Sequence, residues 1–238
     1  MPRSKKDVIA IVLCGGLGTR LRSVTNDEVP KPMVSVEGRP FLEYLLDSII
    51  DQGITNIVLA VSHRKESIME HFGSSYKRAN ISYSIELEPL GTGGAINHAI
   101  NEISHSVDAP VLVLNGDTFV DFDLATMLDK LPENMLSIAV KEMSNTSRYG
   151  RVEITTSNKI ISFTEKKEGL QGYINAGVYL INPEYFEELP RKDKYSFEQE
   201  FLHPKAKLEK FYAHVVNQRF IDIGIPEDYY RCAELVSG

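Results

Sequence analysis

Cysteine is scarce in this chain of 238 residues, which contains only Cys14 and Cys232. Two cysteines so far apart form neither a disulfide framework nor the ligand spacing of a metal site. We therefore expect both to be small buried residues of a protein that works in a reducing compartment.

Long apolar runs are also missing. Residues 8–14 (VIAIVLC) follow the charged segment 1–7, and a glycine pair ends the run. This run is too short for a secretory signal, and no other stretch approaches the roughly 20 residues that cross a bilayer. The sequence predicts a cytoplasmic protein without membrane contact.

An excess of basic residues is absent as well, because the formal net charge is −7. Proteins that bind nucleic acid usually carry a basic patch, so the composition argues against a nucleic-acid partner. A nucleotide site needs only a few local cations and is compatible with this charge. The composition leaves the oligomeric state open, with a homo-oligomer among the options.

The hydrophobic pattern of the first half alternates between strands and helices. Residues 8–13 form a β-rich apolar run that is typical of a strand buried on both faces. Apolar residues then recur at helical spacing from Phe41 to Ile50, and Gly53 is the stop signal. Further strands are expected at 57–61, 81–87 and 111–114, and further helices at 68–72 and 95–103.

Such alternation predicts an α/β fold with three αβα layers and a Rossmann-like, mixed but mainly parallel sheet. The second half changes to β-like segments separated by turn residues. These segments are 136–141, 150–154, 160–165, 174–181 and 219–223, followed by a helix at 227–235. We expect a single domain over residues 1–238, with halves that meet near residue 135, and the chain contains no hexapeptide repeat that would build a β-helix.

Three glycines, Gly15, Gly16 and Gly18, directly follow the first predicted strand. Glycine permits positive φ and close backbone approach, so that N–H groups can point at phosphate oxygens. Arg20 and Lys31 add the guanidinium fork and the point charge that suit a triphosphate. The pattern indicates a phosphate-binding loop, although a plain tight turn is an alternative for the glycines alone.

Two other phosphate-binding motifs are excluded. A P-loop requires GxxxxGK[ST], and this string is absent. The dinucleotide motif GxGxxG begins at Gly16, but Leu21 occupies the third glycine position. This motif usually has an acidic residue about twenty positions later, and Glu37 and Glu43 are only weak matches for it.

The longer string is more specific. Residues 13–21 (LCGGLGTRL), followed by 30–33 (PKPM), resemble the signature of the sugar-1-phosphate nucleotidyltransferases, with Cys14 in place of the commoner alanine. The resemblance extends over nearly the whole chain. It implies a glycosyltransferase-A-like nucleotidyltransferase fold, in which the first half binds a nucleoside triphosphate and the second half a sugar 1-phosphate.

The resemblance also implies roles in the nucleotide half. Arg20 and Lys31 would bind the phosphates. The loop 88–95 (EPLGTGGA) stands before a predicted helix and would bind the base, whereas a plain helix start is the alternative on the residues alone. The implied nucleotide-binding residues are Leu13, Gly15, Gly16, Gly18, Thr19, Arg20, Lys31, Glu88, Gly91, Thr92, Gly116 and Asp117.

Two aspartates stand at strand ends, Asp117 in the segment NGD and Asp222 in the segment FIDIG. Aspartates at such positions are often turn formers, but at this edge of a parallel sheet a carboxylate can hold a hard divalent cation. Both match the paired metal ligands of the family. The resemblance therefore implies Mg²⁺ held by Asp117 and Asp222, and a catalytic set that also includes Arg20 and Lys31.

Three segments of the second half resemble the sugar-phosphate site of the family. Lys166 would hold the phosphate of the sugar, while Glu165 and Asn175 would bind hydroxyls; a solvated charge run is the alternative for Lys166. Residues 196–198 (SFE) resemble a family segment that borders the sugar pocket. The implied substrate-binding residues are Tyr149, Gly150, Glu165, Lys166, Asn175 and Gly177.

The implied reaction is in-line attack of a sugar-1-phosphate oxygen on the α-phosphorus of a nucleoside triphosphate, with release of pyrophosphate. Loop 90–95 and residues 220–229 (FIDIGIPEDY) look most like those of bacterial D-glycero-α-D-manno-heptose 1-phosphate guanylyltransferases, which make GDP-heptose for capsules or S-layer glycans. Relatives that use mannose 1-phosphate, or UTP, CTP or dTTP, share most of these residues. No residue of the sequence distinguishes guanine from the other bases.

Two other classes of function compete with this interpretation. A nicotinamide-dependent oxidoreductase would need the third glycine that Leu21 displaces. A non-catalytic nucleotide-sugar sensor would be expected to lose Lys31 or one of the two aspartates, and this chain keeps all three. The sequence therefore favours an enzyme.

Overall fold

The computed structural model describes residues 8–16, 18, 21, 29–103, 109–131, 134–164 and 171–236. Four of the residues expected in the site, Thr19, Arg20, Glu165 and Lys166, lie outside these ranges. In the described part of the chain no helix is long and apolar enough to cross a membrane. The cytoplasmic location stays a prediction.

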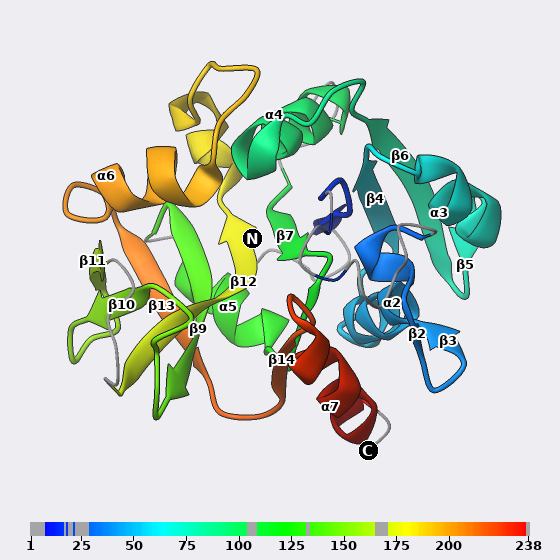
Figure 1. Ribbon diagram of the computed structural model, residues 1–238. Coiled ribbons are helices and arrows are strands. Elements are labelled where there is room, and N and C mark those ends of the chain that lie inside the picture. Colours follow the sequence, from blue (N-terminus) through cyan, green and yellow to red (C-terminus); the bar gives the residue numbers. More distant parts are fainter. Residues whose placement is uncertain are drawn as a thin grey trace.

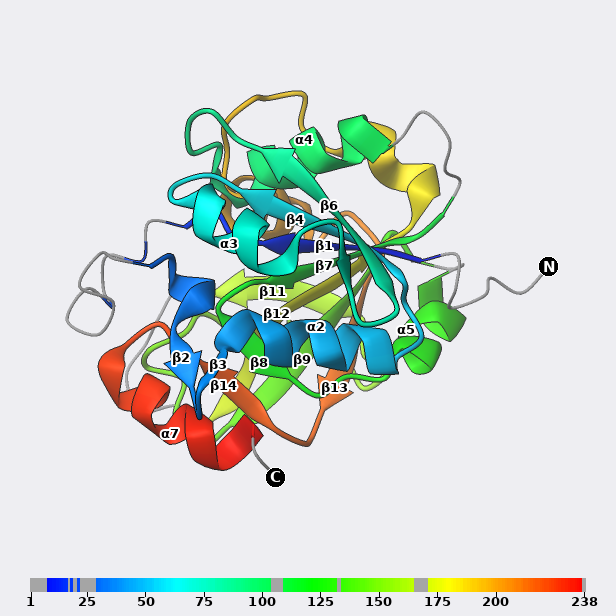
Figure 2. The ribbon, with the colours of Figure 1, turned by 90° about the vertical axis from the view of Figure 1, so that its right-hand side faces the viewer.

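A ten-stranded mixed sheet forms the centre of the molecule (Figures 1 and 2). The strand order is β11-β10-β12-β7-β1-β4-β6-β5, and β9 pairs with both β12 and β13. The bounds are β1 (Ile9–Leu13), β4 (Asn56–Val61), β5 (Ser75–Tyr76), β6 (Ala79–Ile85), β7 (Val111–Asn115), β9 (Leu136–Met143), β10 (Arg151–Ile154), β11 (Ile160–Thr164), β12 (Gly172–Ile181) and β13 (Phe211–Val216). Two small ribbons join β2 (Ser35–Val36) to β3 (Arg39–Pro40) and β8 (Thr118–Val120) to β14 (Phe220–Asp222).

Strand β1 is buried on both faces, as its apolar sequence predicts. Ala10 and Val12 belong to one hydrophobic cluster and Ile11 to another, because successive side chains of a strand point to opposite faces. Strands β7, β1, β4 and β6 run parallel to one another, while β12 is antiparallel to β7. The α/β class and the mainly parallel sheet are confirmed.

Helices cover both faces of the sheet. Helix α2 (Phe41–Asp51) buries the apolar stripe expected from the sequence and packs in the first cluster together with α3 (Lys65–Phe72). Helix α4 (Gly91–Ile103) and the π-helix η7 (Phe197–Leu202) belong to the second cluster. The remaining helices are η3 (Lys31–Met33), α5 (Leu124–Lys130), η6 (Pro183–Glu188), α6 (His203–Lys205) and α7 (Pro226–Val236).

Strands from both halves of the sequence share the large sheet. Strand β12 pairs directly with β7, so Val178 lies opposite Leu114. The ribbon β8–β14 makes a second connection, because Asp222 lies opposite Thr118. The fold thus brings β14, from the second half of the sequence, beside β8, which follows β7.

Candidate functional site

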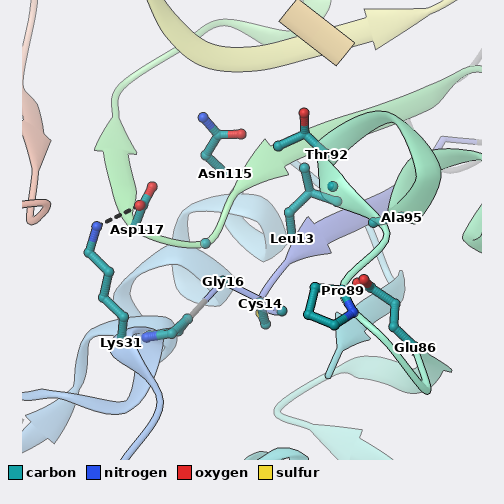
Figure 3. Close-up of a pocket in the computed structure, with 14 residues that line it drawn as sticks. Leu13, Cys14, Gly16, Lys31, Glu86, Pro89, Thr92, Ala95, Asn115 and Asp117 are labelled. Atoms are coloured by element: carbon teal, nitrogen blue, oxygen red, sulfur yellow. Dashed lines mark hydrogen bonds and ion pairs between the residues drawn. The ribbon is translucent and has the colours of Figure 1, made fainter. Parts of the chain in front are cut away.

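A pocket of about 270 Å³ lies at the carboxyl ends of β1 and β7 (Figure 3). Ligands of parallel α/β sheets usually bind at this edge. The pocket is built from the segment after β1, the start of η3, the connection from β6 to α4, and the residues after β7. Its lining residues are Leu13, Cys14, Gly15, Gly16, Lys31, Pro32, Glu86, Pro89, Gly91, Thr92, Ala95, Asn115, Gly116 and Asp117.

A lysine and two aspartates meet at one end of this pocket. Nζ of Lys31 lies 2.6 Å from Oδ2 of Asp117 and 3.9 Å from Oδ1 of Asp222. Lys31 is only 8% exposed, and a buried ammonium group needs anionic partners of this kind. The convergence of these three residues is the one expected from the sequence.

Asp222 does not line the pocket, but the pairing of β14 with β8 brings it beside Lys31 and Asp117. The backbone N–H of Ile223 donates to the carbonyl oxygen of Asp117 at 3.0 Å. The N–H of Gly224 donates to Oδ1 of Asp222 at 2.7 Å, which orients the carboxylate. Backbone hydrogen bonds therefore fix the position of Asp222 relative to Asp117.

The two carboxylates fit a magnesium ion that is shared with a phosphate ligand. Among the residues that the structure describes, no group of three metal-ligating side chains occurs. Mg²⁺ in phosphate-handling enzymes is usually held by one or two carboxylates, and water and phosphate oxygens complete its coordination. Asp117 and Asp222 supply that minimal set beside Lys31, whose single positive charge offsets only one of the two carboxylates.

The glycines of the pocket have different structural reasons. The N–H of Gly116 donates to the carbonyl oxygen of Leu13 at 3.0 Å, and a Cβ atom at position 116 would lie 2.5 Å from that oxygen. A Cβ atom at Gly16 would meet no atom of the described residues within 4 Å. Gly116 therefore allows β1 and β7 to end side by side, whereas Gly16 keeps the floor of the pocket open.

Glu86 is the acidic residue at the other end of the pocket (Figure 3). It follows β6 directly, is 6% exposed, and accepts a hydrogen bond from Leu90 N at 2.9 Å through Oε2. Burial raises the pKa of this carboxyl group. Glu88, which the sequence places among the nucleotide-binding residues, is exposed and does not line the pocket, whereas Glu86 lines it and holds the loop through Leu90 N.

The start of α4 is held against a distant segment of the chain. Gly93 N donates to the carbonyl oxygen of Tyr195, and Tyr195 N donates to that of Leu90, both at 3.0 Å. Side chains at Gly93 and Gly94 would overlap with Tyr195 and with Asp193. The double glycine in this loop thus permits close packing, which the sequence alone does not separate from ligand contact.

Gly91 and Thr92 line the pocket as expected, but the hydroxyl group of Thr92 is already engaged. It donates to Oε2 of Glu198 at 2.7 Å and accepts from Phe197 N at 2.9 Å. A contact of Thr92 with a base would therefore use the remaining lone pair of its hydroxyl oxygen, its backbone or its methyl group. Glu198 belongs to the SFE segment that the sequence places near the sugar pocket.

Tyr149 and Gly150 lie close to the aspartates without lining the pocket. The ring of Tyr149 packs edge-on against Phe220 at 6.0 Å, and the guanidinium of Arg148 lies 5.5 Å from its centre. Burial, and then the negative charge of Asp222, raise the pKa of Tyr149 to about 12. Its hydroxyl group therefore stays a neutral hydrogen-bond donor.

Asn175 and Gly177 adjoin the pocket from the side of β12. Oδ1 of Asn175 accepts from Gly177 N at 3.0 Å. Gly177 has a φ of +74°, and a Cβ atom there would lie 2.6 Å from Nδ2 of Asn115, which lines the pocket. Asn175 and Gly177, which are expected to bind the sugar, thus stand beside Asn115 in the wall of the pocket.

A family model described as Nucleotidyl transferase matches residues 9–237. The chain belongs to the nucleotidyl transferase family. It is 45% identical over 221 residues to a D-glycero-alpha-D-manno-heptose 1-phosphate guanylyltransferase of Campylobacter jejuni, covering 93% of this chain and 96% of that protein. The family resemblance inferred from the sequence is confirmed.

Two further similarities extend over nearly full length. An Aneurinibacillus thermoaerophilus protein with the same name is 43% identical over 92% of this chain and 94% of its own length. The crystal structure of HddC from Yersinia pseudotuberculosis complexed with GMP-PN superposes with a TM-score of 0.83 at 39% identity, covering 95% of this chain and 98% of that one.

Proposed function

We propose that this nucleotidyl transferase moves GMP from GTP to D-glycero-α-D-manno-heptose 1-phosphate, giving GDP-heptose and pyrophosphate. The observation that carries the proposal is the distribution of charged residues in the pocket. Lys31 and Asp117 lie at one end and Glu86 lies at the other (Figure 3). The two curated relatives at 45% and 43% identity are named for this reaction.

The Glu86 end suits guanine better than the other bases. Guanine presents two neighbouring donors, N1–H and the N2 amino group, on one edge, and a carboxylate is a pure acceptor. Uracil and thymine present one donor between two acceptors, so they leave a carboxylate opposite an acceptor. A Cβ atom at Gly15 would lie 2.8 Å from Oε1 of Glu86, so the missing side chain keeps this oxygen accessible.

The Lys31 end suits the phosphates. The backbone after β1, with Gly15 and Gly16 in the pocket wall, offers N–H groups, and the Lys31 ammonium offers a compact positive charge. Arg20, which lies outside the described residues, would add a guanidinium fork by family resemblance. These groups would stabilise pyrophosphate as it leaves with the electron pair of the broken P–O bond.

We further propose that Asp117 and Asp222 hold Mg²⁺, which supplies neutralisation of the α-phosphate when it is bound. The attacking oxygen of the sugar phosphate is an anion near neutral pH, so the site needs no general base. Positioning and charge neutralisation by Lys31 and its neighbours then carry the rate enhancement.

The acceptor would lie between Tyr149 and the Asn175–Gly177 turn. Tyr149 keeps its proton because its pKa is about 12, so it donates to a sugar or phosphate oxygen. Asn175 adjoins the pocket through Gly177 and Asn115. Glu165 and Lys166, outside the described residues, would bind a hydroxyl group and the sugar phosphate by family resemblance.

The test is pyrophosphate release with Mg²⁺, GTP and a panel of sugar 1-phosphates. We expect the highest kcat/KM with D-glycero-α-D-manno-heptose 1-phosphate. A preference for mannose 1-phosphate would replace the proposal by a mannose-1-phosphate guanylyltransferase. Binding of GTP without turnover of any acceptor would favour the nucleotide-sugar sensor.

A further inference from the structure

A continuous chain of hydrogen bonds connects the nucleotide pocket to the sugar half. Oγ1 of Thr92 donates to Oε2 of Glu198 at 2.7 Å. The hydroxyl group of Tyr179 donates to the other oxygen of Glu198 at 3.2 Å, and it accepts from Nδ2 of Asn175 at 2.8 Å. Thr92 lines the pocket, so the chain runs from the nucleotide loop to a residue assigned to the sugar.

The direction of each hydrogen bond in this chain is fixed by its chemistry. A carboxylate has only acceptors, so the hydroxyl groups of Thr92 and Tyr179 must both donate to Glu198. The lone pairs of the Tyr179 oxygen are then left for Asn175. Because Oδ1 of Asn175 accepts from Gly177 N at 3.0 Å, the orientation of its amide group is determined as well.

Asn175 is the last residue of β12 to pair with β9 before the ladder is interrupted. It lies opposite Val140, and the pairing resumes with Tyr179 opposite Ile138. Gly177, inside this interruption, has a left-handed backbone with φ of +74°. The side chain of Asn175 contacts Gly177 N and the hydroxyl group of Tyr179, so it connects the two sides of the interruption.

Glu198 and Tyr179 are themselves held firmly. Glu198 lies on the π-helix η7, a rare geometry that is frequent at functional sites. Tyr179 is 1% exposed and packs edge-on against Phe197 at 5.2 Å. Burial raises the pKa of Tyr179 well above its ordinary value, so its hydroxyl group keeps the proton that it donates.

We propose that Glu198 and Tyr179 are positioning residues that aim Asn175 at the sugar 1-phosphate and couple its orientation to Thr92 in the nucleotide loop. This inference rests on the proposed function. Its consequence is cooperative binding: a nucleotide that orders Thr92 strengthens the binding of the sugar phosphate, and the reverse holds by linkage.

Tyr179→Phe tests the series of hydrogen bonds from Thr92 to Asn175, and Tyr195→Phe is a matched control. Tyr195 is also buried, at 2% exposure, and packs against the start of α4. Its hydroxyl group donates to Asn97, which takes no part in the hydrogen bonds from Thr92 to Asn175. For Tyr179→Phe we expect the KM for heptose 1-phosphate at saturating GTP to rise about tenfold, the effect of one lost hydrogen bond, while the Kd for GTP in the absence of the sugar phosphate stays nearly unchanged. Tyr195→Phe should change neither.

Glu198→Gln is the second variant. Its amide keeps an acceptor for one hydroxyl group and turns an N–H toward the other, so it should reproduce the rise in the KM for the sugar phosphate. Equal effects of Tyr179→Phe and Tyr195→Phe, or an effect confined to the KM for GTP, would overturn the proposal.

Amide hydrogen exchange at Gly177 gives a readout that needs no turnover. Loss of the Tyr179 hydroxyl group frees Asn175, so exchange at Gly177 should be faster in Tyr179→Phe than in Tyr195→Phe. If no substrate pair is turned over, the proposed function fails while this comparison still tests the positioning. Identical Gly177 exchange in the two variants would overturn it.

Discussion

Nζ of Lys31 lies 2.6 Å from Oδ2 of Asp117, although the two residues are 86 positions apart. With Asp222 at 3.9 Å, the ammonium group is shared by two carboxylates at the rim of the pocket. A triphosphate would add negative charge to this cluster, and Mg²⁺ would restore the balance. The contact thus marks the point where phosphate chemistry is expected.

Asp117→Asn should lower kcat by about a thousandfold while the fold persists, because the amide keeps the shape and removes the negative charge that would hold Mg²⁺. Steady-state kinetics measures the loss, and circular dichroism reports the fold. Asp121→Asn is the control, since Asp121 pairs with Arg219 outside the pocket. Near-normal turnover of a folded Asp117→Asn would remove Asp117 from the metal site.

Glu86→Gln should change base preference. A glutamine presents one donor and one acceptor, so it suits uracil or thymine better and guanine less well than a carboxylate. We expect the ratio of kcat/KM for GTP to that for UTP to fall at least about tenfold. Glu88→Gln, at the exposed neighbouring position, should leave the ratio unchanged. The opposite pattern would assign base selection to Glu88.

Gly116→Ala and Gly16→Ala should fail in different ways. A methyl group at position 116 would lie 2.5 Å from the carbonyl oxygen of Leu13, so the free energy of unfolding should drop by about 1–3 kcal/mol. A methyl group at position 16 meets no atom of the described residues within 4 Å, so the free energy of unfolding should hold while the KM for GTP rises. Calorimetry and kinetics separate the two effects. A destabilised Gly16→Ala would argue against an open phosphate cradle.

His214 should make stability depend on pH. It is 8% exposed on β13 and accepts from Asp123 N at 3.4 Å, and burial lowers its pKa below 6.5. As pH falls through 6.5 the unfolded chain binds a proton that the folded chain does not, so the free energy of unfolding decreases. His214→Gln keeps an acceptor and cannot titrate. Urea unfolding between pH 8 and pH 5 should show a steeper loss in the original protein, and parallel curves would contradict this.

The sequence predicted the central fold because its signals were local. The apolar run from Val8 to Leu13 and the helical stripe from Phe41 to Ile50 each specify one element without help from the rest of the chain. Helix α5 and strand β13 were not anticipated. Helix α5 is short, so its apolar periodicity is weak. Asp123, whose side chain caps it by accepting from Ala125 N and Thr126 N, was the signal in the sequence that could have revealed it.

The pocket was predicted less completely than the fold. Lys31, Asp117 and Asp222 matched a family pattern, and the carboxyl-edge rule for parallel sheets placed Asp117 near the glycines that follow β1. The rule does not cover Asp222, which comes beside Lys31 through the antiparallel ribbon β8–β14. Glu86 was missed because one buried carboxylate at a strand end looks like any other polar residue in sequence. The link from Thr92 to Glu198 spans 106 positions and depends on tertiary packing, so no local pattern reveals it.

The central claim is tested most directly by competition. The protein is mixed with Mg²⁺, D-glycero-α-D-manno-heptose 1-phosphate and equal concentrations of GTP, UTP, CTP and dTTP, and the nucleotide sugars formed are identified by mass spectrometry. We predict that GDP-heptose is the dominant product. A different dominant nucleotide sugar, or none, would contradict the assignment.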